Sequence, residues 1–285
     1  MVLVSGNLRG VAWMCGTVLW LSLMALAARE LAASYSVIQI VFVRNVVGFL
    51  VILAIVLHQG RAVMRTGRTG LHIVRNAFHI AAVSCWFYGI GLLPLAEVFV
   101  LELTLPIWVL LMAAPVLGER LTRPRMMAVG LGFAGILIVL RPGMALIDPV
   151  ALVVLAGAAG FAAANVATKI LTRTDSALTI VFWMFAIQLA MSIGPALPGM
   201  ALPQAAQWPW IVAVGVTGIA AHYCTARALG LAESGVVIPL HYLRVPLIAW
   251  LGWLIYDERA DAWLWLGGLV IFIGAMINLR GEKRG

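Results

Sequence analysis

The sequence predicts an all-α integral membrane protein whose ten transmembrane helices form two inverted five-helix repeats. Three observations support this fold class. Of the 285 residues, 64% are hydrophobic and only 11% are charged, whereas soluble domains carry about 25% charged residues. Ten apolar stretches approach the length of roughly 20 residues that a membrane helix needs. A set of residues also recurs at an offset of about half the chain.

The apolar stretches are separated by charged residues and by prolines and glycines. We predict membrane helices over residues 10–28, 36–57, 71–90, 95–117, 126–140, 150–171, 177–195, 209–228, 235–256 and 263–280. The stretches are too long and too uniformly apolar for barrel strands, which alternate between apolar and polar residues. The first stretch resembles a secretory signal, but its removal would leave the first half one span short, so we expect it to be retained.

The two halves of the chain repeat one pattern. The matching pairs are Glu97 and Glu233, Pro106 and Pro246, Glu119 and Glu258, and Arg141 and Arg280, with offsets of 136, 140, 139 and 139. We predict repeats over residues 9–143 and 149–281. Each repeat holds five predicted spans, which is an odd number, so the second repeat enters the membrane in the opposite orientation.

The basic residues predict the orientation in the membrane. On the side of the two termini we count 14 of the 19 Lys and Arg residues, whereas the opposite side has only Arg29, Arg141 and Arg259. Cytoplasmic loops are the ones enriched in Lys and Arg, so we expect both termini in the cytoplasm. The formal charge of +8 fits loops that meet anionic lipid headgroups, and we expect no nucleic-acid partner.

Motifs for enzymatic or metal chemistry are absent from the sequence. Cys15, Cys85 and Cys224 lie in separate predicted spans and have no metal-ligand spacing. No phosphate-binding loop, zinc-protease motif or nucleophile motif occurs. We therefore expect no catalytic residues, no metal and no cofactor.

Four ionisable residues lie near the centres of predicted spans, namely Arg44, His79, Glu102 and Arg244. A charge at that depth costs at least ~2.5 kcal/mol, so it normally faces the bundle interior and a partner. The four residues come from both halves, which favours one central substrate cavity. The alternative is a structural ion pair between Arg44 and Glu102. The two arginines exceed the glutamate by one charge, which a substrate carboxylate could balance, and Glu102 could meet a substrate ammonium group.

Two stretches add candidate residues. His72, Asn76, His79, Val83 and Trp86 share one face of the third span; we favour helix packing for the first two and cavity lining for His79 and Trp86. The ninth span contains a polar run, which adds the candidates His241 and Tyr242 to Arg244. Pro106 and Pro246 are predicted bends beside the cavity, with better helix packing as the alternative.

The repeated passage is similar to a known family. The residues that carry the similarity are Leu95-Ala96-Glu97, Pro106, Gly118-Glu119-Arg120-Leu121 and Arg141-Pro142-Gly143 in the first half, and Ala232-Glu233, Pro246, Glu258-Arg259 and Gly274 in the second. Over nearly the whole chain it resembles the ten-span EamA-type members of the drug/metabolite transporter superfamily. The resemblance implies a bacterial inner-membrane bundle that exports small metabolites, amino acids being the best-known cargo. It gives Glu119 and Glu258 a structural role at helix ends.

These observations lead to an expected function. We expect a secondary carrier that exports amino acids or similar small metabolites by alternating access, with or without proton coupling. The first alternative is a carrier of a larger aromatic or cationic compound such as riboflavin or S-adenosylmethionine, for which Trp86, Tyr88 and Trp183 would form the pocket. A membrane enzyme or a scaffold is a remote alternative. The sequence does not predict an oligomeric state.

Overall fold

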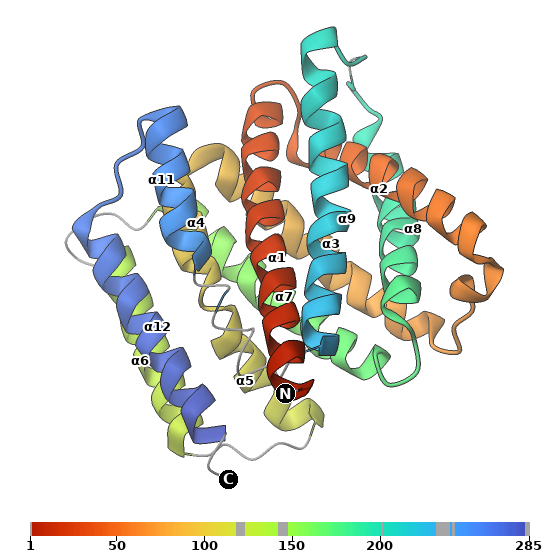
Figure 1. Cartoon of the computed structure of the whole chain (residues 1–285). Coiled ribbons are helices and arrows are strands. Elements are labelled where there is room, and N and C mark those ends of the chain that lie inside the picture. Colours follow the sequence, from red (N-terminus) through yellow and green to blue (C-terminus); the bar gives the residue numbers. More distant parts are fainter. Residues whose placement is uncertain are drawn as a thin grey trace.

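The computed structural model describes residues 2–117, 123–141, 148–200, 202–231, 240 and 243–282, and their regular elements are helices (Figure 1). The first half contains α1 (Val2–Ala32), α2 (Val37–Gln59), the 3-10 helix η1 (Arg61–Met64), α3 (Thr69–Leu92), α4 (Leu95–Glu102), α5 (Leu105–Leu117) and α6 (Arg123–Leu140). The second contains α7 (Pro149–Leu171), α8 (Ala177–Ala196), η2 (Ala205–Gln207), α9 (Trp208–Leu231), α11 (Arg244–Tyr256) and α12 (Ala262–Glu282).

A helix occurs at each of the predicted apolar stretches, but the fourth stretch differs. We predicted one helix over 95–117, and the structure ends α4 at Glu102 and begins α5 at Leu105. Thr104 at the break donates a hydrogen bond to the carbonyl oxygen of Leu101 at 2.7 Å, so a side chain satisfies one carbonyl that a continuous helix would satisfy itself. The apolar composition gave no sign of this break.

Several residues of the sequence argument lie outside the described residues. These are Gly118, Glu119, Arg120, Leu121, Pro142, Gly143, Ala232, Glu233, Pro239, His241 and Tyr242. In the described part, the helices that are long and apolar enough to cross a membrane are Leu8–Ala32, Val37–Gln59, Pro149–Leu171 and Ala177–Ala196.

Local sequence explains where several helices begin. Asp148 accepts a hydrogen bond from the amide of Val150 at 2.8 Å, and Pro149 follows it as the first residue of α7. Ser176 accepts one from the amide of Thr179 at 3.1 Å ahead of α8. Side-chain acceptors of this kind satisfy amides that have no partner within the first turn, and proline at the first position lacks only an amide that would be unpaired anyway.

The principal helix contacts join the two halves of the chain. α1 packs on α9, α3 on α7, α2 on α8 and α9, α5 on α7, α4 on α11 and α6 on α12. The α6 and α12 pair stands at one side of the bundle, and α1 begins at the end of the bundle where α12 finishes (Figure 1). The halves therefore interleave and do not form separate bodies.

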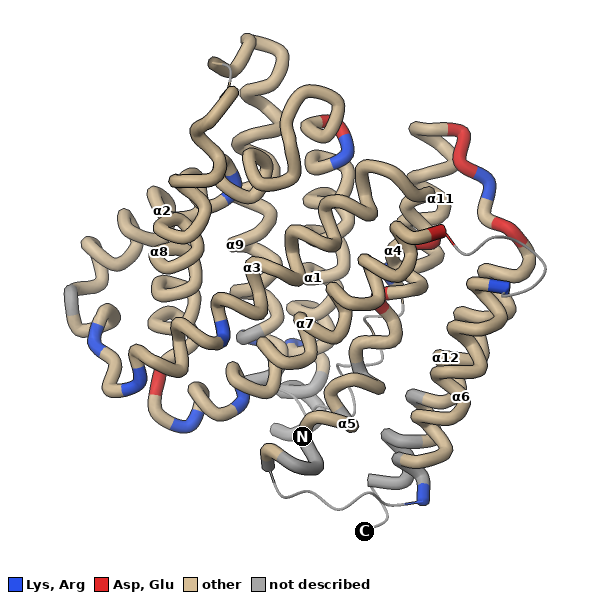
Figure 2. The backbone as a smooth tube through the Cα atoms, turned by 180° about the vertical axis from the view of Figure 1, so that it is seen from behind, with Lys and Arg blue, Asp and Glu red and all other residues tan. Residues whose placement is uncertain are grey.

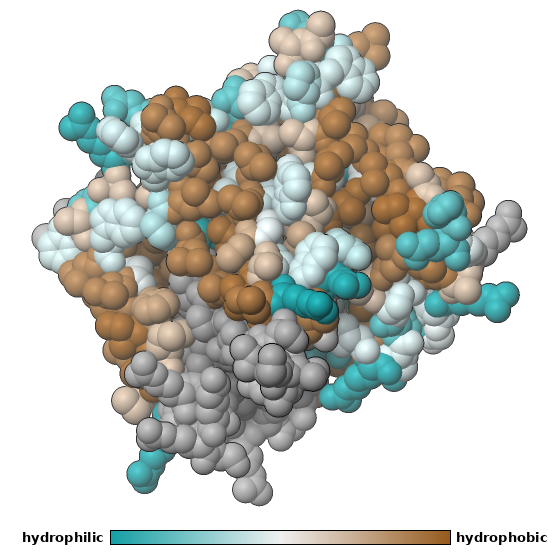
Figure 3. All heavy atoms as spheres, in the orientation of Figure 1, coloured by the Kyte–Doolittle hydropathy of each residue, from teal (hydrophilic) through white to brown (hydrophobic). Residues whose placement is uncertain are grey.

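The outer surface is apolar. Leu50 and Leu57 of α2, Leu137 of α6, and Trp253 and Leu254 of α11 are all more than half exposed. Figure 3 shows hydrophobic residues over much of the described surface on one face, and Figure 2 shows most described charged residues at helix ends and in loops. Such a surface is stable against lipid chains and unfavourable in water.

Candidate functional site

Arg44 lies in the interior of the bundle. Its side chain projects from α2 and is 0% exposed. The Nη1 atom donates hydrogen bonds to Asn45 Oδ1 at 3.1 Å and to Gln188 Oε1 of α8 at 3.4 Å. The guanidinium carbon lies 5.2 Å from the ring centre of Phe185, a cation–π contact. Arg44 is thus held by neutral groups.

Gln188 connects Arg44 to a second buried arginine. Its Nε2 atom donates to Asn76 Oδ1 at 2.9 Å and contacts His79 Nδ1 at 3.1 Å. Arg75 Nη1 donates to the same Asn76 oxygen at 2.9 Å, and Arg75 Nε donates to Thr168 Oγ1 of α7 at 3.1 Å. We name Arg44, Arg75, Asn76, His79 and Gln188 the arginine cluster.

A second group of polar side chains lies around Glu102, the last residue of α4. Arg244, the first residue of α11, donates from Nη2 to Glu102 Oε2 at 2.5 Å. Trp86 Nε1 of α3 donates to the same oxygen at 3.1 Å, and the Arg244 guanidinium carbon lies 4.8 Å from the ring centre of Phe99. A carboxylate from the first half and a guanidinium from the second therefore form one group, which we name the glutamate pair.

The four predicted central residues fall into these two groups. Arg44 and His79 belong to the arginine cluster, whereas Glu102 and Arg244 pair with each other. The alternative of a structural ion pair between Arg44 and Glu102 is wrong, because each has other partners. His79 and Trp86 lie seven residues apart on α3, so the groups are separated by about 10 Å along that helix.

The two predicted bends lie in first turns. Pro106 is the second residue of α5, and the helix is interrupted just before it. Pro246 is the third residue of α11 and is exposed. In a first turn, the missing amide of proline removes no helical hydrogen bond. His241 and Tyr242 lie outside the described residues.

Sequence reasoning missed Arg75. We counted it among the basic residues of the terminal side because it follows a loop, yet its residue exposure is only 5%. Its spacing was informative, because it lies three residues after His72 and four before His79, on the same side of a helix. The position of an arginine within a polar stripe of a helix therefore predicts its burial better than its distance from the start of the span does.

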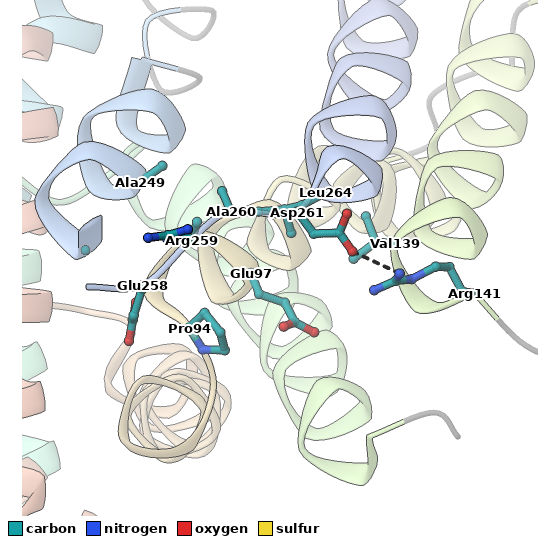
Figure 4. A pocket seen from close by; sticks show the side chains of 12 residues that line it. Pro94, Glu97, Val139, Arg141, Ala249, Glu258, Arg259, Ala260, Asp261 and Leu264 are labelled. Atoms are coloured by element: carbon teal, nitrogen blue, oxygen red, sulfur yellow. Dashed lines mark ion pairs between the residues drawn. The ribbon is translucent and has the colours of Figure 1, made fainter. Parts of the chain in front are cut away.

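A small pocket lies where α4, α6, α11 and α12 approach one another (Figure 4). Its volume is about 110 Å³, and its charged lining residues are Glu97, Arg141, Glu258, Arg259 and Asp261. Arg141 Nη1 and Asp261 Oδ2 form an ion pair at 2.9 Å.

Glu258 at this pocket makes two contacts with the first half of the chain. It pairs with Arg29 of α1 and accepts a hydrogen bond from the amide of Leu95, the first residue of α4, at 2.7 Å. These contacts agree with the structural role expected for this signature position.

The family assignment follows from comparison with known proteins. Residues 8–141 and 149–280 each match the model of the EamA-like transporter family. The chain belongs to this family. EamA proteins are multi-pass membrane transporters and not enzymes, so the all-helical structure with an apolar surface is that of a membrane transporter of small metabolites.

The relatives carry different molecules. A riboflavin transporter of Brucella anthropi is 27% identical over 252 residues, covering 86% of this chain and 88% of the relative. The pseudopaline exporter CntI of Pseudomonas aeruginosa is 29% identical and covers 93% of each chain. An S-adenosylmethionine uptake transporter of Rickettsia prowazekii is 21% identical, covering 97% of this EamA protein and 94% of the relative. These relatives support metabolite transport in general and not amino-acid export in particular.

A solved crystal structure shares the fold. It has a TM-score of 0.68 at 18% identity and covers 96% of this chain and 98% of its own.

Proposed function

We propose that this EamA protein is a secondary carrier of the bacterial inner membrane that exports amino acids or similar small zwitterionic metabolites by alternating access. The observation that carries the proposal is the glutamate pair. Glu102 ends one helix of the first half and Arg244 begins one of the second, and the two are joined by an ion pair. The fourth predicted span is interrupted between Glu102 and Leu105, and transporters commonly bind substrate near interrupted helices where two repeats meet.

We infer an inverted-repeat architecture of ten spans, with repeats over residues 9–143 and 149–281 and both termini in the cytoplasm. The helix contacts support the relation between the repeats, and the distribution of Lys and Arg supports the orientation. In the predicted numbering, α1 and α9 are spans 1 and 8, whereas α7 and α3 are spans 6 and 3. If every span is replaced by its counterpart in the other repeat, the contact of α1 with α9 becomes the contact of α7 with α3. The pairs α2 with α8, α4 with α11 and α6 with α12 remain the same pairs. A pseudo-two-fold axis produces this relation.

The chemistry of the glutamate pair suits a substrate with two opposite charges. A substrate carboxylate would replace Glu102 as the partner of Arg244, and a substrate ammonium would replace Arg244 as the partner of Glu102. Each group then keeps a partner of opposite charge while the substrate is bound, which limits the cost of burying charge in the membrane. Trp86 would remain a donor to Glu102 in both states.

Transport by purified protein in liposomes tests this proposal. We expect counterflow of a radiolabelled amino acid by the unaltered protein, and a loss of at least about tenfold in Glu102→Gln and Arg244→Gln, because each removes a charge that the substrate needs. Asp257→Asn and Arg173→Gln remove exposed charges and serve as matched controls. Undiminished counterflow in correctly folded Glu102→Gln and Arg244→Gln protein would remove the pair from the transport site.

The aromatic surroundings of the pair support a second candidate, a carrier of a larger aromatic or cationic compound. Trp86 has Phe87 and Phe99 within 5.7 Å between ring centres. The structure does not bring Trp86, Tyr88 and Trp183 together in the pocket we expected, because Tyr88 is exposed and Trp183 stacks on His72. Competition of unlabelled riboflavin and S-adenosylmethionine against amino-acid counterflow distinguishes the candidates.

A further inference from the structure

The arginine cluster contains two positive charges that no described carboxylate balances. Among the described residues, the hydrogen-bond partners of Arg44 are Asn45 and Gln188, and those of Arg75 are Asn76 and Thr168. All four partners are amides or a hydroxyl. Arginine does not release its proton in proteins, and buried charges are normally paired. The cluster therefore lacks an anion.

Arg44 presents an unused binding edge. Its Nε and Nη2 atoms are buried and have no hydrogen-bond partner in the described part of the chain. These two nitrogens lie side by side on one edge of the guanidinium group. This edge can bind a carboxylate or phosphate through two parallel hydrogen bonds. The unused donors thus match one class of ligand.

Gly218 of α9 lies beside this edge. A Cβ atom at Gly218 would lie 3.2 Å from Arg44 Nε, which is tighter than ordinary van der Waals contact, so a side chain at this position would crowd the edge. His222 lies one turn further along α9, and its ring centre is 5.5 Å from that of His79. The rings of His79 and His222 therefore lie next to each other, and Gln188 joins His79 to Arg44.

We propose that the arginine cluster binds an oxyanion, a carboxylate or phosphate group, that belongs to the transported substrate. This inference rests on the proposed function and extends it to the substrate class. The cluster lies about 10 Å from the glutamate pair along α3, so the substrate would be a metabolite that carries an oxyanion in addition to the groups bound by Glu102 and Arg244.

Burial favours a substrate over a lipid headgroup as the source of the oxyanion. Arg44 and Arg75 are 0% and 5% exposed, and their contacts come from α3, α7 and α8. A headgroup binds at the surface of a bundle, where its acyl chains remain in the bilayer. A substrate that enters between the helices meets no such restriction.

The first experiment measures the melting temperature of the full chain in detergent as the concentration of inorganic phosphate, or of acetate, is increased at constant ionic strength. We expect both oxyanions to raise the melting temperature. Arg44→Lys keeps the charge but removes the two-nitrogen edge, so the half-saturating phosphate concentration is expected to rise at least about tenfold. Arg173→Lys, an exposed change, is the matched control. No stabilisation, or equal stabilisation of Arg44→Lys, overturns the proposal.

A second variant keeps the test decisive if Arg44→Lys does not fold. Asn45 already accepts a hydrogen bond from Arg44 at 3.1 Å, so Asn45→Asp supplies a carboxylate of nearly the same shape. We expect a higher melting temperature without phosphate and a smaller phosphate response. Asn165→Asp adds the same charge at an exposed position of α7 and is expected to do neither. An unchanged phosphate response in Asn45→Asp contradicts the proposal.

Two further measurements distinguish a substrate from a lipid headgroup as the source of the oxyanion, and they distinguish this inference from the proposed carrier function. Stabilisation by phosphatidylglycerol micelles, with none by phosphate or acetate, would assign the site to a headgroup and overturn the substrate assignment. Arg244→Gln is expected to lose counterflow and keep its phosphate response. Counterflow by the unaltered protein without any oxyanion response refutes this inference alone, whereas an oxyanion response of the unaltered protein without counterflow refutes the proposed carrier function.

Discussion

Asp175 is a nearly buried carboxylate in the loop between α7 and α8. It accepts hydrogen bonds from Thr66 Oγ1 at 2.7 Å and pairs with His72 Nε2 at 2.7 Å. Burial alone would raise the pKa of Asp175, but the hydrogen bonds from Thr66, His72 and Thr174 outweigh it and hold the pKa below its ordinary value of 3.8. The ionised form therefore stabilises the contact between this loop and the start of α3.

Replacement of this carboxylate gives a pH-dependent prediction. A lowered pKa in the folded state contributes stability above the unfolded-state pKa, and this contribution is lost as the pH falls through the folded-state pKa. Asp175→Asn is expected to lower stability by about 1–3 kcal/mol at neutral pH, with the difference from the unaltered protein shrinking below pH ~4. Thermal melts across pH, with Asp257→Asn as the exposed control, measure both effects.

Single residues show how far sequence reasoning reached. Burial of Arg44, His79, Trp86 and Arg244 followed from their positions within apolar stretches, since a polar group there avoids lipid. Their partners did not follow, because a one-dimensional pattern does not say which helices touch. We expected one of the two arginines to lack a carboxylate partner. The structure pairs Arg244 with Glu102, and the described hydrogen-bond partners of Arg44 are amides.

At the level of helices, glycines set the approach of α6 and α12. A Cβ atom at Gly135 would lie 2.7 Å from the carbonyl oxygen of Gly267, and a Cβ atom at Gly267 would lie 2.7 Å from that of Gly135. The side chains of Ile271 and Val139 are also close to these Cβ positions, but the two carbonyl oxygens belong to the backbone and cannot move aside as a side chain can. Such close contacts through small residues are the usual way in which helices associate in membranes.

This contact predicts opposite effects for two similar substitutions in one helix. Gly135→Ala is expected to lose about 1–3 kcal/mol through overpacking, measured as a lower melting temperature. Gly130 has nothing within 4 Å of its added Cβ, so Gly130→Ala is expected to be neutral or to gain about 0.5–1 kcal/mol in helix propensity. Equal behaviour of the two variants would contradict close packing at Gly135.

Not every glycine within a helix lies at a close contact. Gly135, Gly157, Gly267 and Gly274 lie at close helix contacts, whereas Gly130 has nothing within 4 Å of an added Cβ atom. The helices themselves followed from apolar length. The break after Glu102 did not, because hydrophobicity continues across it.

For the whole molecule, the proposed inversion of the repeats predicts which loops face which compartment. In a variant without its three native cysteines, a cysteine at Arg259 is expected to react with a membrane-impermeant maleimide in intact spheroplasts. A cysteine at Arg173 is expected to react only after permeabilisation, because cytoplasmic loops carry most basic residues. Labelling of both sites in intact spheroplasts would contradict an odd number of spans between them.

The contacts of Glu258 have a consequence for motion. One carboxylate of the second half binds both Arg29 at the end of α1 and the first amide of α4. A rearrangement that separates Glu258 from these two helices breaks both interactions together. Tyr256 at the end of α11 also donates a hydrogen bond to Glu30 of α1 at 2.8 Å, so opening of this end requires the simultaneous loss of several polar contacts.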